Sequence, residues 1–186
     1  MAIILASQSP RRQELMRLFG KPFTVRVADI DETMDPKGDP AVQVAQVSAK
    51  KAHAIDHGYD DVVIAADTIV VCDGQILGKP KDDAHAFAML KILSGRTHQV
   101  MTGMTVLYRD QVITHTEITN ISFCELTDEQ IRRYIATGEP MDKAGAYGIQ
   151  GGAALFATGI QGDYYNVVGL PVCRLGQILK NLEECV

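Results

Sequence analysis

Two adjacent arginines occupy positions where cations are unfavourable, so they are the first candidates for a binding site. Arg11 and Arg12 follow Ser9 and a proline, which is a typical helix start with serine as the cap. The N–H groups of a first helical turn carry partial positive charge, so each cation there costs roughly 0.3–1 kcal/mol. A bound phosphate would offset that cost, and the hydroxyls of Ser7 and Ser9 would donate to it. Surface arginines paired with nearby acids are the alternative.

Acidic residues at two places could bind a metal ion or accept a proton. Asp67 follows the apolar run Val62–Ala66, which predicts a buried strand that ends at the aspartate. Ligands of open α/β sheets bind beyond the carboxyl ends of strands, so Asp67 is a candidate site residue. Asp31 and Glu32 lie in an acidic loop and supply hard oxygen ligands. A turn aspartate and a solvated loop are the respective alternatives.

Three lysines are candidate partners for an anion. Lys50 and Lys51 fall on a helix predicted over residues 40–55, and Lys79 precedes a proline that forces an extended backbone and projects the side chain. A surface position is the alternative for each lysine. The segment before Lys79 is one residue short of a P-loop and has proline where serine or threonine would hold magnesium, so a Walker-type hydrolase is not supported.

A glycine-rich stretch over residues 142–152 could approach a flat ligand closely, because glycine carries no side chain. Gln150 in this stretch offers both donors and an acceptor, as the edge of a pyrimidine base requires. The glycines do not follow the GxGxxG order, so a dinucleotide dehydrogenase is not supported. A surface loop without a ligand is the alternative.

The elements that must position these residues alternate between strands and helices early in the chain. Strands are predicted over 2–6, 23–27 and 62–66, and again over 99–123 with a turn near residue 109. Asp73-Gly74 predicts a hairpin between strands over 68–72 and 75–77. Helices are predicted over 10–19, 40–55, 82–93, 127–136 and 171–182, and an irregular stretch over 141–169. This order is typical of an α/β fold with a mixed sheet.

Length and composition narrow the function classes. A chain of 186 residues predicts one domain over 1–186 with two lobes. The 18 basic and 23 acidic residues give a net charge of −5 without a basic stripe, so no long nucleic acid is expected as a partner. The four cysteines lack zinc-site spacing and fit free thiols in a reducing compartment. With no membrane-spanning run and no signal peptide recognised, a cytoplasmic protein is expected.

A set of short motifs spans nearly the whole chain in a fixed order. The motifs are Leu5–Arg12, Asp31-Glu32, Ala66–Thr68, Gly78–Pro80, Ser94–His98, Asp142–Gly151 and Val168–Pro171. Each is weak alone, but the ordered set resembles the Maf-like nucleotide pyrophosphatases. The resemblance implies an elongated, twisted mixed sheet flanked by helices, with two lobes around a central cleft, similar to inosine triphosphate pyrophosphatase.

The resemblance also implies an activity. Maf-like pyrophosphatases cut nucleoside triphosphates between the α and β phosphates, and this chain is similar to the branch acting on dTTP and UTP. Asp67 matches the family's catalytic aspartate, and Arg11, Thr68 and Gln150 match its specificity residues. One alternative is a regulator of septum formation that binds nucleotides without hydrolysing them. Another is a hydrolase whose main substrates are modified nucleotides.

Hydrolysis at the α-phosphorus requires an in-line water and cations around the phosphate chain. The residues expected to bind phosphate are Ser7, Ser9, Arg11, Arg12, Lys50 and Lys79. Glu32 and Asp67 are expected to hold Mg²⁺ or Mn²⁺. Asp67 could instead, or as well, accept the proton of the water, and the sequence leaves these competing roles open. A homodimer is expected by family analogy alone.

Overall fold

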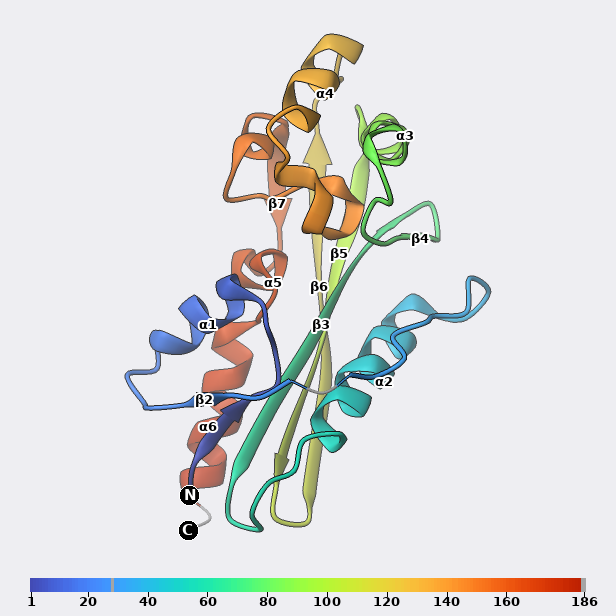
Figure 1. Cartoon of the computed structure of the whole chain (residues 1–186). Helices are drawn as coiled ribbons and strands as arrows, with labels where there is room; N and C mark the ends of the chain where they lie inside the picture. The colour runs from blue at the N-terminus through green and yellow to red at the C-terminus, as the bar shows by residue number, and fades with distance from the viewer. Residues whose placement is uncertain (28, 185–186) are drawn as a thin grey trace. The chain divides into compact units, whose positions relative to one another are not determined.

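The computed structural model describes residues 1–27 and 29–184, which form a mixed α/β structure (Figure 1). The strands are β1 (Ile3–Leu5), β2 (Thr24–Val25), β3 (Val62–Cys72), β4 (Gln75–Leu77), β5 (Thr97–Tyr108), β6 (Gln111–Phe123) and β7 (Ala157–Gln161). The α-helices are α1 (Pro10–Arg17), α2 (Pro40–His53), α3 (Asp83–Leu93), α4 (Asp128–Ile135), α5 (Tyr164–Val168) and α6 (Val172–Glu184). The strand order is β2-β1-β3-β5-β6-β7, with β4 paired to β3. The predicted α/β fold class with a mixed sheet is confirmed.

The chain divides into two compact units. Unit 1 comprises Met1–Asp67, Thr102–Glu117 and Gly169–Val186, and unit 2 comprises Thr68–Met101 and Ile118–Val168. Strands β3, β5 and β6 contribute residues to both units. The sequence-based expectation of two lobes around a cleft stays a prediction.

In unit 1, a parallel three-strand arrangement forms around β1. Ile4 of β1 lies opposite Thr24 of β2 and Val63 of β3. Parallel neighbours require crossover connections, and α1 and α2 supply them. Both helices begin as predicted, because Ser9 caps α1 and Asp39 caps α2, each just before a proline.

Helix α2 packs very closely on β5 within unit 1. A side chain on Gly103 would place its Cβ 2.4 Å from the carbonyl oxygen of Val44, so only glycine permits this approach. Hydrogen bonds continue from α2 into the sheet, since Ser48 Oγ lies 2.8 Å from Thr105 Oγ1 and that atom lies 3.0 Å from Thr114 Oγ1. These contacts fix the rotation of α2, and therefore which of its side chains face the sheet.

In unit 2, α3 and α4 cover a core of aliphatic and aromatic side chains. The core includes Leu90, Val100, Ile121, Phe123, Ile131 and Phe156. The predicted hairpin joins β3 to β4, where Asp73 and Gly74 have φ values of 49° and 78°. Two positive φ values are what a two-residue hairpin turn of this kind requires. On the other side of the unit, β6 pairs antiparallel with β7.

Three sequence-based expectations need correction. The strand predicted over 62–66 does not end at Asp67, because β3 continues without a break to Cys72. The β-branched residues after Asp67 keep the chain extended, and the pairing of Val70 and Val71 with β4 holds that half in the sheet. The stretch over 141–169, expected to be irregular, contains β7 and α5. The strand expected over 23–27 is confined to Thr24–Val25.

Candidate functional site

A lysine joins the two acidic positions singled out in the sequence. In unit 1, the Nζ atom of Lys51 lies 2.7 Å from Oδ1 of Asp67 and 2.9 Å from Oε1 of Glu32. Lys51 and Asp67 are largely buried, whereas about half of the Glu32 side chain is exposed at 53%. Residues from the acidic loop, α2 and β3 therefore converge on one ammonium group.

Local structure explains how Glu32 reaches this cluster. The neighbouring Asp31 accepts a hydrogen bond from the backbone N–H of Thr33 at 2.9 Å, which forms a turn. This bonding to Thr33 lowers the pKa of the Asp31 carboxyl, with a smaller contribution from Lys50. Asp31 thus stabilises its own loop as a carboxylate, and Glu32 is the acid of the pair that binds Lys51.

The start of α1 supplies the cationic part of the site. Arg12 donates from Nε to the carbonyl oxygen of Gly169 at 2.7 Å and from a terminal nitrogen to Oγ of Ser7 at 3.3 Å. Burial lowers the pKa of the Arg12 guanidinium, and the negative charges of Asp67 and Glu32 oppose that shift. The positive charge of the neighbouring Arg11 lowers the Arg12 pKa further.

Both predicted serines take part in this arrangement. Ser9 Oγ accepts from the backbone N–H of Arg12 at 3.4 Å, and Ser7 Oγ accepts from the backbone N–H of Ser9 at 3.2 Å. A hydroxyl that accepts still carries its own proton, so each serine can also donate to an anion. Unit 1 therefore brings together Ser7, Ser9, Arg11, Arg12, Glu32 and Asp67.

In the part of the chain that the structure describes, the remaining predicted residues take no part in the ion pairs of the Lys51 ammonium group. Lys50 lies on α2 and acts electrostatically on Asp31. Thr68 follows Asp67 on β3 but belongs to unit 2, as do the exposed residues Lys79 and Gln150. The sequence-based prediction selected Lys50 for the site and left out Lys51, which is the lysine that binds Glu32 and Asp67. The buried residues Val44, Val47 and Ser48 define the inner face of α2, and helical periodicity places Lys51 on that face.

The glycine-rich stretch packs against the protein's own side chains. A Cβ on Gly145 would lie 2.8 Å from a methyl carbon of Val70, and one on Gly151 would lie 2.1 Å from Oε1 of Glu139. Gly148 approaches Lys143 in the same way, because a Cβ on this glycine would lie 2.7 Å from Cε of the lysine. Close approach was the expected reason for these glycines, and the groups approached here are Val70, Lys143 and Glu139.

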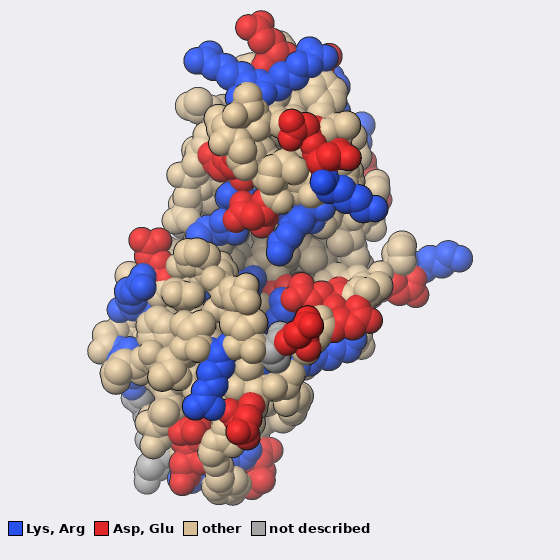
Figure 2. All heavy atoms as spheres, in the orientation of Figure 1, with Lys and Arg blue, Asp and Glu red and all other residues tan. Residues whose placement is uncertain are grey.

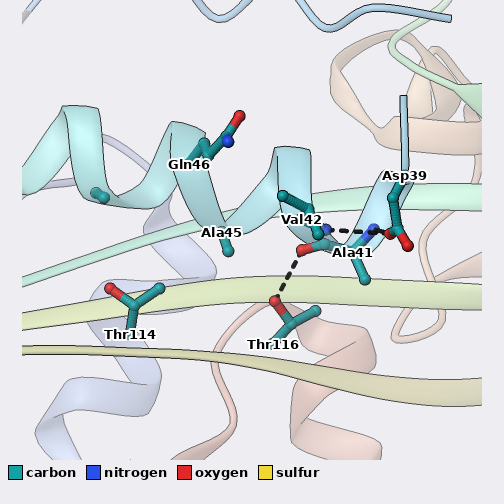
Figure 3. Close-up of a pocket in the computed structure, with 8 residues that line it drawn as sticks. Asp39, Ala41, Val42, Ala45, Gln46, Thr114 and Thr116 are labelled. Atoms are coloured by element: carbon teal, nitrogen blue, oxygen red, sulfur yellow. Dashed lines mark hydrogen bonds between the residues drawn. The ribbon is translucent and has the colours of Figure 1, made fainter. Parts of the chain in front are cut away.

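A hollow of about 500 Å³ lies between α2 and β6 in unit 1 (Figure 3). It is lined by Asp39, Ala41, Val42, Ala45, Gln46, Ala49, Thr114 and Thr116. Asp39 already accepts hydrogen bonds from the backbone of Ala41 and Val42, and Thr116 donates to the carbonyl of Ala41 (Figure 3). The lining contains no basic residue, so this hollow does not suit a triphosphate.

Figure 2 shows basic and acidic side chains intermixed on the drawn face of the described residues, without a continuous basic stripe there. Over residues 1–27 and 29–184, no three His, Cys, Asp or Glu side chains converge as a ready metal site. None of the described helices has the length and apolar character needed to cross a membrane.

The chain is similar to known proteins over nearly its whole length. It is 50% identical over 182 residues to a dTTP/UTP pyrophosphatase from Bacillus cytotoxicus, covering 97% of this chain and 95% of that protein. It is 48% identical over 179 residues to a dTTP/UTP pyrophosphatase from Bacillus anthracis, covering 96% and 94%. A HAM1 protein from Coxiella burnetii shares the fold, with a TM-score of 0.53 at 15% identity, over 97% of this chain and 100% of that one. The model of the Maf-like protein family matches residues 2–182, and the chain belongs to that family.

Proposed function

We propose that this protein hydrolyses dTTP and UTP to the nucleoside monophosphate and pyrophosphate. The observation that carries the proposal is the cluster in unit 1, where Lys51 joins Glu32 and Asp67 and Arg12 is coupled to both acids. The relatives that are about half identical over nearly the full chain are named for this activity. A cluster of mixed charge suits phosphoryl-type chemistry, which depends mainly on positioning and electrostatic stabilisation.

Cations and hydroxyls near α1 are assigned to the phosphate chain. Arg12 is held by Gly169 and Ser7, so its guanidinium is oriented before substrate arrives. A preoriented guanidinium stabilises developing charge without reorganisation during the reaction. Next to Arg12, the guanidinium of Arg11 adds a second positive charge, and the hydroxyls of Ser7 and Ser9 add hydrogen-bond donors. Lys50 and Lys79 are assigned to outer phosphate oxygens.

Asp67 is assigned the proton of the attacking water. Lys51 engages Oδ1 of this carboxylate, and the proposal gives the other oxygen, Oδ2, to the water. The ion pair fixes the direction of the carboxylate, as a general base requires. The α-phosphorus–oxygen bond to the β-phosphate breaks as the water oxygen bonds to phosphorus, and pyrophosphate leaves.

A divalent metal fits the residues present. Mg²⁺ is commonly held by one or two carboxylates together with substrate phosphates and water, and Glu32 provides one such carboxylate. Asp67 would provide the second in place of its role as the base, because Lys51 engages Oδ1 and leaves Oδ2 for one of these two roles. When bound, Mg²⁺ or Mn²⁺ would neutralise charge on the phosphate chain. The described acids and histidines supply no larger ligand set, so phosphate oxygens and waters would complete the coordination.

Arg11, Thr68 and Gln150 are assigned to selection of the base, as their match to the family motifs implies. Thr68 is the residue after Asp67 on β3, so the base-reading and catalytic positions are adjacent in sequence. A homodimer in the cytoplasm, with no nucleic-acid or membrane partner, completes the proposal.

Pyrophosphate release from dTTP and UTP tests the proposal directly. We expect release in the presence of Mg²⁺ or Mn²⁺, and loss of release with a chelator that is reversed by added metal. A parallel panel of canonical and modified nucleotides, ranked by kcat/KM, identifies the preferred substrate. Tight nucleotide binding without any release would contradict hydrolysis and favour the regulatory alternative.

A further inference from the structure

One carboxylate in unit 2 holds both ends of the short segment that carries Gln150. Oε2 of Glu139 accepts from the backbone N–H of Gly152 at 3.0 Å, and Oε1 accepts from the hydroxyl of Tyr134 at 2.8 Å. The Tyr134 oxygen in turn accepts from the backbone N–H of Gly148 at 3.0 Å. The five residues from Gly148 to Gly152 are therefore fixed at each end.

Between these anchors the chain makes a tight turn. The N–H of Gly151 donates to the carbonyl oxygen of Gly148 at 3.1 Å, so Ile149 and Gln150 are the two central residues. Ile149 is buried and Gln150 is exposed. The buried neighbour and the two anchored ends together fix the backbone position from which the Gln150 side chain projects.

Glu139 cannot shift without moving this turn. A Cβ on Gly151 would lie 2.1 Å from Oε1 of Glu139, so the backbone rests directly on the carboxylate. Lys143 supports the same region, because its Nζ donates to the carbonyl oxygen of Glu139 at 2.7 Å and its stem lies against Gly148. The Glu139 carboxylate is packed so closely against the backbone of Gly151 that moving either one displaces the other.

Packing holds Tyr134, which links Glu139 to the backbone of Gly148, in a fixed position. Its ring packs edge-on against Phe156 at 5.2 Å between centroids, and it lies on α4 with only 5% of the residue exposed. Burial, together with the bond to Glu139, raises the pKa of the Tyr134 hydroxyl. The hydroxyl therefore keeps the proton that it donates to Glu139.

We propose that Glu139 and Tyr134 are positioning residues that set base selectivity by fixing the orientation of Gln150. The proposal rests on the proposed function, in which Gln150 contacts the base. Neither residue needs to contact the nucleotide. Each acts on selectivity through the turn that carries the glutamine.

The test compares nucleotide selectivity in matched variants of the full chain. Glu139→Ala removes both acceptors, and Tyr134→Phe removes one hydroxyl while keeping the ring against Phe156. Glu139→Gln retains one oxygen acceptor and is the conservative rescue. Glu129→Ala is the control, because Glu129 is an exposed acid on the same helix as Tyr134. For each protein, kcat and KM for UTP and dATP and the Kd of both nucleotides are measured.

We expect Glu139→Ala and Tyr134→Phe to reduce the preference for UTP over dATP by about tenfold, the effect of misdirecting one hydrogen bond. The loss should appear in KM and Kd more than in kcat. Glu139→Gln should recover part of the preference, and Glu129→Ala should match the parent. In a Gln150→Ala background, Glu139→Ala should cause no further loss of selectivity.

Unchanged selectivity in Tyr134→Phe, or a loss that adds fully to that of Gln150→Ala, would overturn the proposal. Tyr134→Phe decides the matter even when Glu139→Ala fails to fold, since the ring packing is kept. A parent protein that binds UTP selectively without releasing pyrophosphate would contradict the proposed function alone, and the Kd values would still test the positioning pair. A parent that shows no base preference in either measurement contradicts both.

Discussion

Lys51 and Asp67 form a direct ion pair between α2 and β3, with Nζ 2.7 Å from Oδ1 and side-chain exposures of only 15% and 14%. The Coulomb attraction within such a pair is stronger than in a surface ion pair, because water screens it less. Its lysine also binds Glu32, so one cation holds two acids whose mutual repulsion would otherwise separate them. The pair links the packing of α2 to the geometry of the proposed reaction.

Replacing the carboxylate of Asp67 should remove turnover and keep the fold. Asp67→Asn retains the shape of the side chain but cannot accept a proton, so we expect pyrophosphate release to fall by roughly 10²–10⁴-fold. Thermal unfolding should show that the variant is folded. Asp56→Asn, an exposed aspartate of the same unit, is the control and should retain the parent rate. Near-parent release by Asp67→Asn would exclude Asp67 from the mechanism.

Removing the charge of Lys51 should affect both activity and stability. Lys51→Met keeps an apolar stem of similar length, but leaves Glu32 and Asp67 without their shared cation. We expect kcat to fall about 100-fold, as when one preorganised electrostatic group is lost. The free energy of unfolding should fall by about 1–3 kcal/mol, because a partly buried pair is broken.

The adjacent lysine provides the contrast. Lys50→Met removes a cation one position away, outside the ion pair with Asp67, so its effect should be confined to KM and be several-fold smaller. Lys37→Met, on the exposed loop before α2, should resemble the parent. Equal losses of kcat in Lys51→Met and Lys50→Met would show that catalysis depends on positive charge in this region in general and does not depend on the ion pair with Asp67.

Much of this fold could be predicted from local sequence signals. Ser9 and Asp39 precede prolines and cap α1 and α2, while Asp73-Gly74 closes its hairpin, because each signal acts within a few residues. The continuation of β3 through Asp67 could not be predicted in this way. The sequence predicts strands on both sides of Asp67, and the pairing with β4 follows from the hairpin signal. A single acid between two apolar runs looks like an interruption in sequence, whereas β3 runs through it without a break.

In the candidate site, too, residues close in sequence could be predicted, whereas those brought together by distant packing contacts could not. The unfavourable arginines at the start of α1 marked the site, and their partners Ser7 and Ser9 were found because they are close in sequence. The choice of Lys51 over Lys50 required the rotation of α2. That rotation is set by contacts of α2 with Gly103 and Thr105 of β5, which are distant from both lysines in the chain.

Because α2 packs closely on β5, adding one methyl group at Gly103 is expected to destabilise the fold. In Gly103→Ala the new Cβ would meet backbone atoms of Val44 and Ala45 at 2.4–2.7 Å, and backbone cannot rotate away as a side chain can. We expect a loss of roughly 1–3 kcal/mol in unfolding free energy. Tm should fall by about 3–10 °C.

The displacement of α2 in Gly103→Ala should also move Lys51, so kcat should fall in the same variant. Gly159→Ala is the matched control, because a Cβ there meets nothing within 4 Å. Calorimetry and pyrophosphate release measured on both variants check the prediction. A Tm for Gly103→Ala equal to that of the control would mean that the helix is free to shift without cost.

A buried histidine in unit 2 predicts loss of stability in mild acid. His98 is 2% exposed, lies 2.7 Å through Nε2 from the Tyr147 hydroxyl, and packs edge-on against Phe123. Burial lowers the pKa of His98 from 6.5 to about 4. The unfolded chain therefore binds a proton between these pH values that the folded chain excludes, and stability falls as pH decreases from 6.5 towards 4.

A shift of this size corresponds to about 3 kcal/mol, present in full above pH 6.5 and lost below about pH 4. Urea unfolding of the parent and of His98→Gln across this range measures the contribution, because carboxylates titrate in both proteins and cancel in the difference. We expect the gap between the two unfolding free energies to shrink as pH falls. A gap that is constant with pH would mean that His98 is protonated equally in the folded and unfolded chains, and that the aromatic cluster around it admits the charge.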